Sequence, residues 1–245
     1  MRINRISAGC GLLLASFGLA TPASAGSVAA VPMTMTPIYM GTANVLGMID
    51  AARNSMPKDD QPDTSRTASR PAPSVGSTNF AVAHDPAVSA QARKAFLADI
   101  VRSSGQTVAD QVDQQFGDIQ TTFSRAVTPY GLRTDDFADV MTAYMVMIWL
   151  AANRQVELPQ AAQVQGVKQQ LHAALSGKLG DPRQRQLLAE TMMYQTCIMI
   201  VVREQAEKQR KPELMDTLAA SIDRGSGQGG QLRQMALTTQ GLVRR

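Results

Sequence analysis

The segment from Tyr130 to Arg154 constrains the fold most strongly, because it holds the only tryptophan and the longest nearly unbroken apolar run of the chain. From Phe137 to Ala152, only Asp139 and Thr142 interrupt the apolar residues. A helix that is apolar on every side is normally surrounded by other elements. The run is shorter than the ~20 apolar residues of a membrane span and contains an acidic residue, so we expect protein around it.

The polar residues before this run predict where its helix begins. Thr134 is a residue type that caps helix starts, and Asp135 and Asp136 place negative charge at the positive end of the helix dipole. We therefore expect Thr134 to be the cap.

Further start and stop signals divide the rest of the folded part into helices. An aspartate followed by proline, which marks a cap and a first helical position, occurs at Asp85-Pro86 and again at Asp181-Pro182. Apolar residues at spacings of three and four indicate the buried faces in between. With the central helix, the expected helices run from Asp85 to Ser104, Thr107 to Ala126, Thr134 to Arg154, Pro159 to about Gly177, Pro182 to Arg210 and Leu214 to Ile222.

A second core helix is expected within the fifth of these, because Leu187 to Val202 is nearly all apolar. The predicted fold is therefore all-α, a compact bundle of about five to six helices around two buried apolar helices. The composition agrees: 44% of residues are hydrophobic but only 4% are aromatic, which indicates a core of aliphatic residues and methionine.

Residues 1–25 have the pattern of a secretory signal peptide. Arg2 and Arg5 supply the positive start, Leu12 to Ala20 the apolar middle, and Ala23-Ser24-Ala25 a small-residue cleavage site. We expect cleavage near Ala25 and export to the periplasm or beyond it. The alternative is an N-terminal anchor that stays uncleaved.

Composition sets the expected borders of the folded domain, residues 84–224. Residues 26–83 are expected to be mostly disordered, since Pro57 to Ser77 has almost nothing to bury. Within them Ile38 to Ala52 is a short apolar patch, which either packs on the domain or docks a partner. Residues 225–245 are expected to be a flexible tail.

Cysteine and histidine are too scarce to indicate a site. Cys10 lies in the leader, so Cys197 is the only cysteine of the mature chain and an intramolecular disulfide is excluded. Its apolar neighbours favour a buried thiol over a nucleophile paired with His172. With His84, these three residues are too few and too widely separated for a typical zinc site.

A glycine-rich stretch, Gly225 to Gly230, fits the dinucleotide pattern GxGxxG. That pattern binds phosphate only after a strand and within a βαβ unit. Here it follows an expected helix, so we interpret it as a hinge.

Paired carboxylates raise the possibility of acid/base hydrolysis. Asp136 and Asp139 are three residues apart and share a helix face. Asp139 falls inside the apolar run and needs a partner there, for which Arg125, Arg133 or a tyrosine hydroxyl are candidates. A structural buried pair is the preferred interpretation, and a carboxylate-dependent hydrolase the alternative.

Three methionines near the mature N-terminus, Met33, Met35 and Met40, include an M-x-M pair. Thioethers are soft ligands that suit Cu(I), so a periplasmic Cu(I)-binding protein is a second alternative. The other interpretation is a plain apolar patch.

The turn and helix at the centre of the chain carry a family resemblance. The chain is similar to the signature of an uncharacterised family of exported bacterial proteins at Tyr130-Gly131-Leu132, then at Asp136 and Asp139, and then at Ala143-Tyr144 and Trp149. In that signature Asp-Ala stands where this chain has Asp139-Val140. The resemblance covers about Asp85 to Arg224 and implies a helical domain of unknown activity, so it assigns no catalytic residue.

Charge and motifs together favour a binding role. The formal charge is only +4, and two of the basic residues lie in the leader, so the mature chain lacks the basic character of a nucleic-acid binder. We predict a non-enzymatic exported helical domain that acts in protein interaction or envelope structure. Its partner is an unidentified protein or envelope component, and the sequence assigns it no catalytic, cofactor-binding or metal-binding residue.

Overall fold

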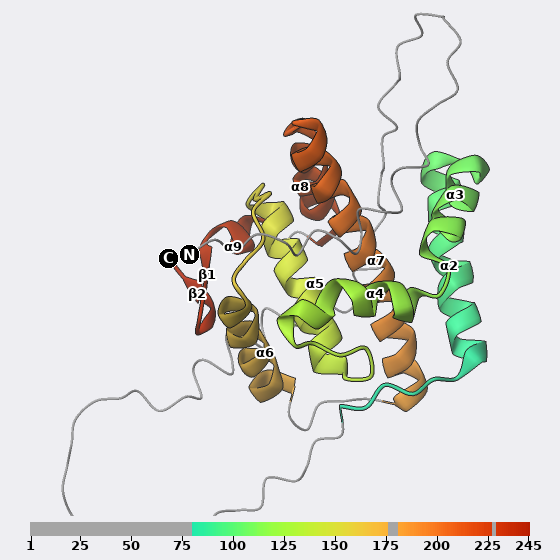
Figure 1. Cartoon of the computed structure of the whole chain (residues 1–245), viewed down its shortest axis with the longest axis horizontal. Coiled ribbons are helices and arrows are strands. Elements are labelled where there is room, and N and C mark those ends of the chain that lie inside the picture. The colour runs from blue at the N-terminus through green and yellow to red at the C-terminus, as the bar shows by residue number, and fades with distance from the viewer. Residues whose placement is uncertain (1–79, 176–180, 227–228) are drawn as a thin grey trace, which may run out of the picture.

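The computed structural model describes residues 80–175, 181–226 and 229–245, which form a helical bundle with a small C-terminal hairpin (Figure 1). The predicted all-α bundle is confirmed for these residues. The leader, the methionine cluster and most of the segment expected to be disordered lie outside them. The elements are α2 (Pro86–Ser104), α3 (Gln106–Phe116), α4 (Ile119–Val127), the 3-10 turn η1 (Thr128–Tyr130), α5 (Phe137–Ala152), α6 (Ala161–Leu175), α7 (Pro182–Gln209), α8 (Glu213–Ser226), α9 (Gly229–Arg233), β1 (Met235–Thr238) and β2 (Gly241–Arg244).

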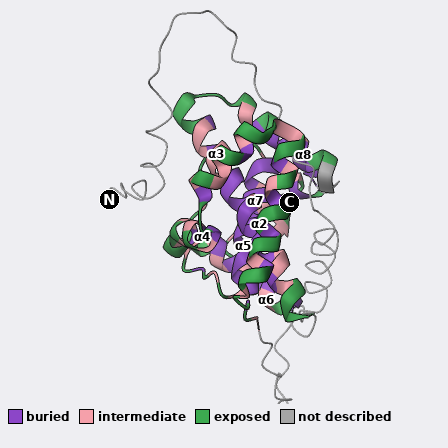
Figure 2. Ribbon diagram, turned by 90° about the vertical axis from the view of Figure 1, so that its right-hand side faces the viewer, coloured by how far each residue is buried: buried purple, intermediate pink, exposed green. Residues whose placement is uncertain are grey.

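Helix α5 forms the centre of the bundle, as the apolar run predicted. Every residue of α5 except Trp149 is buried, and Figure 2 shows this helix as a largely buried ribbon inside the bundle. Helix α5 contacts α6, α7, α8 and α9. Among the described residues, no helix combines the length and apolar content needed to cross a bilayer. The protein surroundings expected for α5 are confirmed.

Helix α7 is the second core helix, although it is less completely covered than α5. Its middle is buried around Met193 and Cys197, where it contacts α2, α4 and α5. Leu187, Leu188 and Val202 are only partly buried. The Asp-Pro signals before α2 and α7 both act as predicted, since Asp85 accepts a hydrogen bond from the Ala87 amide and Asp181 from the Arg183 amide.

The predicted helix from Thr107 to Ala126 is wrong, because the structure divides it into α3 and α4. Gly117 has a φ of 50°, which ends α3, and the Asp118 side chain accepts a hydrogen bond from the Gln120 amide to start α4. The apolar stripe continues across the break, which explains why the spacing alone predicted one helix.

The predicted cap of α5 is also wrong by two residues. Asp136, rather than Thr134, is the N-cap, and its Oδ1 accepts from the amides of Ala138 and Asp139 at 2.9 and 3.2 Å. The chain before α5 is held extended, because Phe137 N donates to Phe80 O at 2.9 Å and Val82 N to Asp135 O at 2.9 Å. The described structure therefore includes residues from Phe80 onward, ahead of the expected border at residue 84.

The expectation of a flexible tail over 225–245 is wrong for the residues described there. Helix α9 and the antiparallel β1–β2 hairpin pack on α5 and α6. Leu232 and Leu242 are fully buried. The hairpin lies against α6 at Gly166, where an added Cβ would stand 2.3 Å from Thr239 O, so only glycine permits this contact.

Candidate functional site

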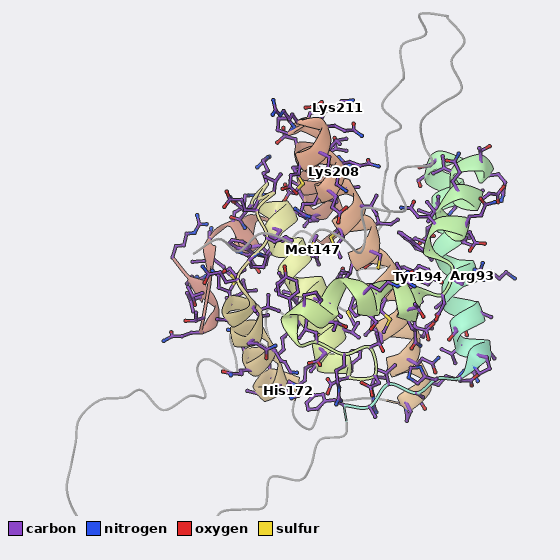
Figure 3. All side chains as sticks on the ribbon, viewed as in Figure 1. Arg93, Met147, His172, Tyr194, Lys208 and Lys211 are labelled. Carbon is purple, nitrogen blue, oxygen red and sulfur yellow. The ribbon has the colours of Figure 1, made fainter. Side chains whose placement is uncertain are left out.

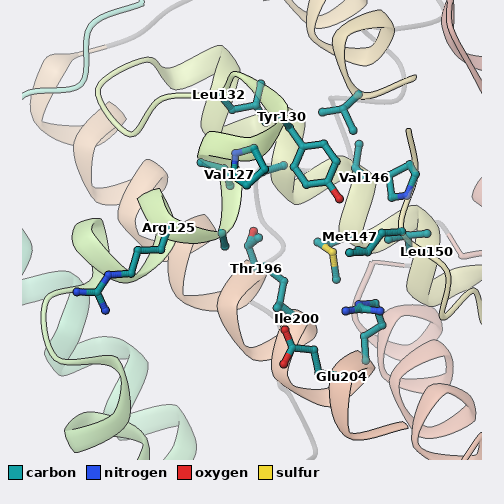
Figure 4. Close-up of a pocket in the computed structure, with 17 residues that line it drawn as sticks. Arg125, Val127, Tyr130, Leu132, Val146, Met147, Leu150, Thr196, Ile200 and Glu204 are labelled. Atoms are coloured by element: carbon teal, nitrogen blue, oxygen red, sulfur yellow. The ribbon is translucent and has the colours of Figure 1, made fainter. Parts of the chain in front are cut away.

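A cavity of about 340 Å³ lies between η1, α5, the start of α6 and α7 (Figure 4). A volume of this size is at the lower end of small-molecule sites in proteins. Most of the residues around it are apolar. They include Val127, Leu132, Ala143, Val146, Met147, Leu150, Leu158, Val164 and Ile200.

The walls of the cavity are set by residues at helical spacing. Ala143, Val146, Met147 and Leu150 lie on one face of α5, and Thr196 and Ile200 lie one turn apart on α7 (Figure 4). Because both helices belong to the core of the bundle, the walls are fixed by the packing that holds the fold together.

Thr196 contributes a polar atom with an unusual environment. It is fully buried, and its Oγ1 has no hydrogen-bond partner among the described residues. Other helical hydroxyls of this chain bond to the carbonyl four residues earlier, as Thr142 does to Ala138 O at 2.7 Å and Thr191 to Leu187 O at 2.8 Å. A buried hydroxyl without a partner is costly, so Thr196 leaves an unused donor and acceptor at the cavity.

Arg203 is the buried cation of the site, with only 5% of its side chain exposed. Its Nη1 donates to Val156 O at 2.6 Å, which holds the α5–α6 loop, and to Glu207 Oε2 at 3.0 Å. No residue in the described part of the chain accepts a hydrogen bond from its Nε. Arg203 therefore supports the edge of the cavity and carries one buried donor that its neighbours cover.

Tyr130 comes from η1 on the opposite side. Gln165 Nε2 donates to Tyr130 O at 2.5 Å, which fixes the turn onto α6. Burial raises the pKa of the Tyr130 phenol, and the positive charge of Arg203 opposes that shift. The phenol therefore stays protonated at neutral pH, close enough to the guanidinium to feel its charge.

The acidic residue of the site, Glu204, is already paired. Lys208 Nζ lies 3.0 Å from Glu204 Oε2, one helical turn away on α7. At the rim, Arg125 is exposed and forms no ion pair within the described part of the chain. The charge around the cavity is thus neutral to positive.

The carboxylates singled out in the sequence lie elsewhere, between α5 and α6. Asp139 has 1% of its side chain exposed, and its Oδ1 lies 2.7 Å from Lys168 Nζ. Its Oδ2 accepts from the Arg133 amide at 3.0 Å. The partner is therefore a lysine of α6 and a backbone amide, and the predicted pairing with a side chain of Arg125, Arg133 or a tyrosine is wrong.

His172 joins these carboxylates, which the sequence did not predict. Ligand atoms of Asp136, Asp139 and His172 all lie within 4.8 Å of one another. Two protein cations stand beside the group, since Lys168 pairs with Asp139 and Arg133 Nη2 lies 3.6 Å from Asp136 Oδ2. The His172 ring packs on Phe80 at 4.4 Å between centroids (Figure 3 shows its place on α6). The cluster fastens the N-terminal strand-like segment and α6 to the start of α5.

A second buried carboxylate, Glu190, was missed because it sits in an apolar stretch of α7 without a motif. It is fully buried, and its Oε1 accepts from Ser89 Oγ, Gln120 Nε2 and Gln186 Nε2 at 2.7, 3.2 and 2.9 Å. These donors come from α2, α4 and α7. Glu190 therefore joins three helices through a polar network.

The remaining candidates are distributed as follows. Cys197 is buried, as its apolar neighbours predicted, and His84 is exposed near the start of α2. The GxGxxG stretch connects α8 to α9, with residues 227–228 outside the described part, and the element before it is a helix instead of the strand that phosphate binding requires. Met33, Met35 and Met40 also lie outside the described residues.

Comparison with known proteins places the chain in a family. No curated protein matches it, and no solved structure matches it. The sequence pattern of a family of unknown function, DUF6683, matches residues 5–245, nearly the whole chain. The resemblance to an uncharacterised family is thereby confirmed, and the chain belongs to the family of unknown function DUF6683.

Proposed function

We propose that this protein is a non-enzymatic binding protein whose helical domain accepts an apolar group of its partner in the cavity between η1, α5 and α7. The observation that carries the proposal is the cavity itself, whose walls are almost entirely apolar side chains of core helices. Apolar cavities with a few polar groups are the usual form of small-molecule sites.

We further propose that the protein is exported and works in the bacterial envelope or outside the cell. The support is in the sequence, which has the charged start, apolar middle and small-residue cleavage site of a signal peptide. The partner would then be an envelope component or a molecule that reaches that compartment. Cu(I) binding by Met33, Met35 and Met40 stays a sequence-based alternative.

Catalysis by Asp139 is the weaker proposal. Acid/base hydrolysis needs a carboxylate that can reach substrate. Asp139 is sealed beside Lys168 and does not line the cavity. Among the described residues, the wall of the cavity offers no pair of carboxylates, since Glu204 is the only acidic residue there.

Binding of the neutral apolar dye N-phenyl-1-naphthylamine, which fluoresces in apolar surroundings, tests the proposal. We expect saturable binding to the purified chain and its loss in Ala143→Leu, because the larger side chain extends into the cavity. Ala161→Leu makes the same change at an exposed position of α6 and should bind the dye normally. An absence of saturable binding, or binding that Ala143→Leu leaves unchanged, would count against a ligand-accepting cavity.

A further inference from the structure

We infer that the ligand of this cavity is an amphipathic monocarboxylate, such as a medium-chain fatty acid, whose chain lies on the apolar walls and whose carboxylate meets Thr196 and Arg203. This inference rests on the proposed function and names its ligand class. It depends on three observations: the unused hydroxyl, the partly used guanidinium and the apolar remainder of the walls.

Thr196 indicates that the ligand accepts a hydrogen bond. Its hydroxyl is buried and has no partner within residues 80–175, 181–226 and 229–245, although the carbonyl of the preceding turn is the usual partner for a threonine on a helix. Figure 4 shows Thr196 among the apolar residues of the cavity, facing the space that Tyr130 and Met147 border. The hydroxyl is covered in the ligand-free chain, so a small shift of the side chains around it lets a ligand oxygen in this space accept its hydrogen bond and removes the cost of its burial.

Arg203 indicates that the accepting group is an anion. Its side chain is almost fully buried, yet its carboxylate partner Glu207 has 57% of its side chain exposed and occupies only Nη1. The Nε donor is not used by any residue that the structure describes. A carboxylate suits a guanidinium better than any neutral acceptor does, because charge-assisted hydrogen bonds are about twice as strong as neutral ones.

The electrostatics of the surrounding residues agree with an anionic head group. Glu204, the acidic residue of the wall, is neutralised by Lys208, and Arg125 adds positive charge at the rim. The Tyr130 phenol is protonated and can donate a further hydrogen bond, since burial raises its pKa. Cationic ligands would meet Arg203 in a water-poor setting, which is unfavourable.

The size and the apolar walls define the rest of the ligand. A cavity of about 340 Å³ holds one small molecule. Sugars or nucleotides carry many hydroxyl groups, most of which would face apolar side chains such as Val146, Met147 and Ile200, and an unpaired buried hydroxyl is costly. An aliphatic chain has no such groups. A monocarboxylate with one apolar chain therefore fits both the apolar walls and the polar groups of Thr196 and Arg203.

The test compares three ligands with the same ten-carbon chain and different head groups: decanoate, methyl decanoate and decylammonium. The affinity of each ligand is measured by displacement of N-phenyl-1-naphthylamine from the purified chain or by calorimetric titration. All ligand concentrations stay below the critical micelle concentration. We expect decanoate to bind at least about tenfold more tightly than the ester, which corresponds to one charge-assisted hydrogen bond. Decylammonium should bind most weakly.

Thr196→Val keeps the shape of the side chain and removes the hydroxyl. We expect this variant to weaken decanoate binding by about tenfold and to raise the unfolding temperature of the ligand-free chain, because an unsatisfied buried group is removed. Thr191→Val is the matched control on the same helix, since Thr191 is bonded to Leu187 O and does not line the cavity. It should lower the unfolding temperature and leave decanoate binding unchanged.

Arg203→Gln keeps an amide donor for Val156 O and removes the charge. The preference for decanoate over its ester should fall to near parity in this variant. The monocarboxylate inference is overturned if the unmodified chain binds the three ligands equally, or if Thr196→Val binds decanoate as tightly as the unmodified chain. Neither result affects dye binding, so the proposed ligand-accepting cavity would still stand. Failure of the dye to bind at all overturns the proposed function itself.

Discussion

Gln170 pairs with both backbone groups of Leu242: its Nε2 donates to Leu242 O at 3.1 Å, and its Oε1 accepts from Leu242 N at 3.0 Å. The two residues are 72 positions apart, and the bonds are buried. The Gln170 side-chain amide of α6 therefore makes the two hydrogen bonds to β2 that a neighbouring strand would otherwise make. On the other strand, Gln163 Nε2 donates to Leu237 O at 2.9 Å and Trp149 Nε1 to Met235 O at 3.0 Å.

We expect Gln170→Ala to lower the free energy of unfolding by about 2 kcal/mol, because two buried backbone groups of Leu242 lose their partners. Urea denaturation of the purified chain measures the loss. The neighbouring Gln169 is exposed, so Gln169→Ala is the control and should change stability by less than about 0.5 kcal/mol. Equal effects of the two substitutions would show that the hairpin does not depend on Gln170.

Gly166→Ala tests the contact between α6 and the hairpin turn. The new Cβ would stand 2.3 Å from Thr239 O and 2.6 Å from Gly241 N, both backbone atoms, so the hairpin must move away from the helix. We expect a loss of about 2 kcal/mol or more, and faster amide hydrogen exchange in β1 and β2.

The control for this substitution is Gly230→Ala on α9, where the nearest atom is a flexible arginine tip 4.0 Å away. Alanine is the better helix former, so this variant should be neutral or slightly stabilised. If Gly166→Ala is equally neutral, the hairpin does not lie as closely on α6 as described.

The sequence predicted those helices whose buried residues form a continuous apolar run or follow a clear start signal. Helix α5 follows from an unbroken apolar run, and α2 and α7 follow from Asp-Pro pairs in front of apolar stretches. The division of α3 from α4 was missed although Gly117-Asp118 is a stop followed by a cap, because the apolar stripe on either side of it keeps its spacing.

The hairpin and the cavity could not be predicted from local patterns. Strands of four residues are too short to show an alternation of apolar and polar side chains. The hairpin of β1 and β2 packs against Gly166 and Gln170 of α6, a helix more than sixty positions earlier in the chain. The cavity combines residues from η1, α5 and α7. Nothing near Thr196 in the sequence shows that its hydroxyl lacks the usual helical partner. Only the tertiary structure supplies that fact.

Tyr194 makes the free energy of unfolding fall as the pH rises through the alkaline range. It is 4% exposed and stacks on Phe96 at 4.3 Å, and burial raises its pKa from 10.0 to about 12 (Figure 3). Below pH 10 the phenol is protonated in the folded and unfolded chains alike. Between pH 10 and about pH 12 the unfolded chain releases the proton first, so the free energy of unfolding falls across this window. The loss should be on the order of 2 kcal/mol.

Tyr194→Phe isolates this effect, because phenylalanine keeps the stacking and cannot ionise. We expect its stability to fall less steeply above pH 10 than that of the unmodified chain. Urea denaturation on both sides of that pH gives the difference, and the ultraviolet absorbance of phenolate gives the tyrosine titration directly. Parallel pH profiles for the two proteins would mean that Tyr194 titrates normally.

The ion pair between Asp139 and Lys168 should stabilise the attachment of α6 to the start of α5. Lys168→Met keeps the apolar stem of the side chain and removes the charge, which leaves the Asp139 carboxylate buried without its cation, while the Arg133 amide still donates to it. We expect a loss of about 2 to 3 kcal/mol in urea denaturation, less than for a fully buried pair because 26% of the Lys168 side chain is exposed.

A second substitution separates the lost pair from lost packing. Adding Asp139→Asn to Lys168→Met makes both partners neutral, and the amide oxygen can still accept from the Arg133 amide. Part of the stability should therefore return, since the cost of the single variant comes from an unpaired buried charge. Lys94→Met, at an exposed position of α2, is the control for loss of a lysine charge and should be nearly neutral. If Asp139→Asn lowers the stability of Lys168→Met by as much as it lowers that of the unmodified chain, the two side chains contribute independently. The ion pair then does not hold α6 to the start of α5.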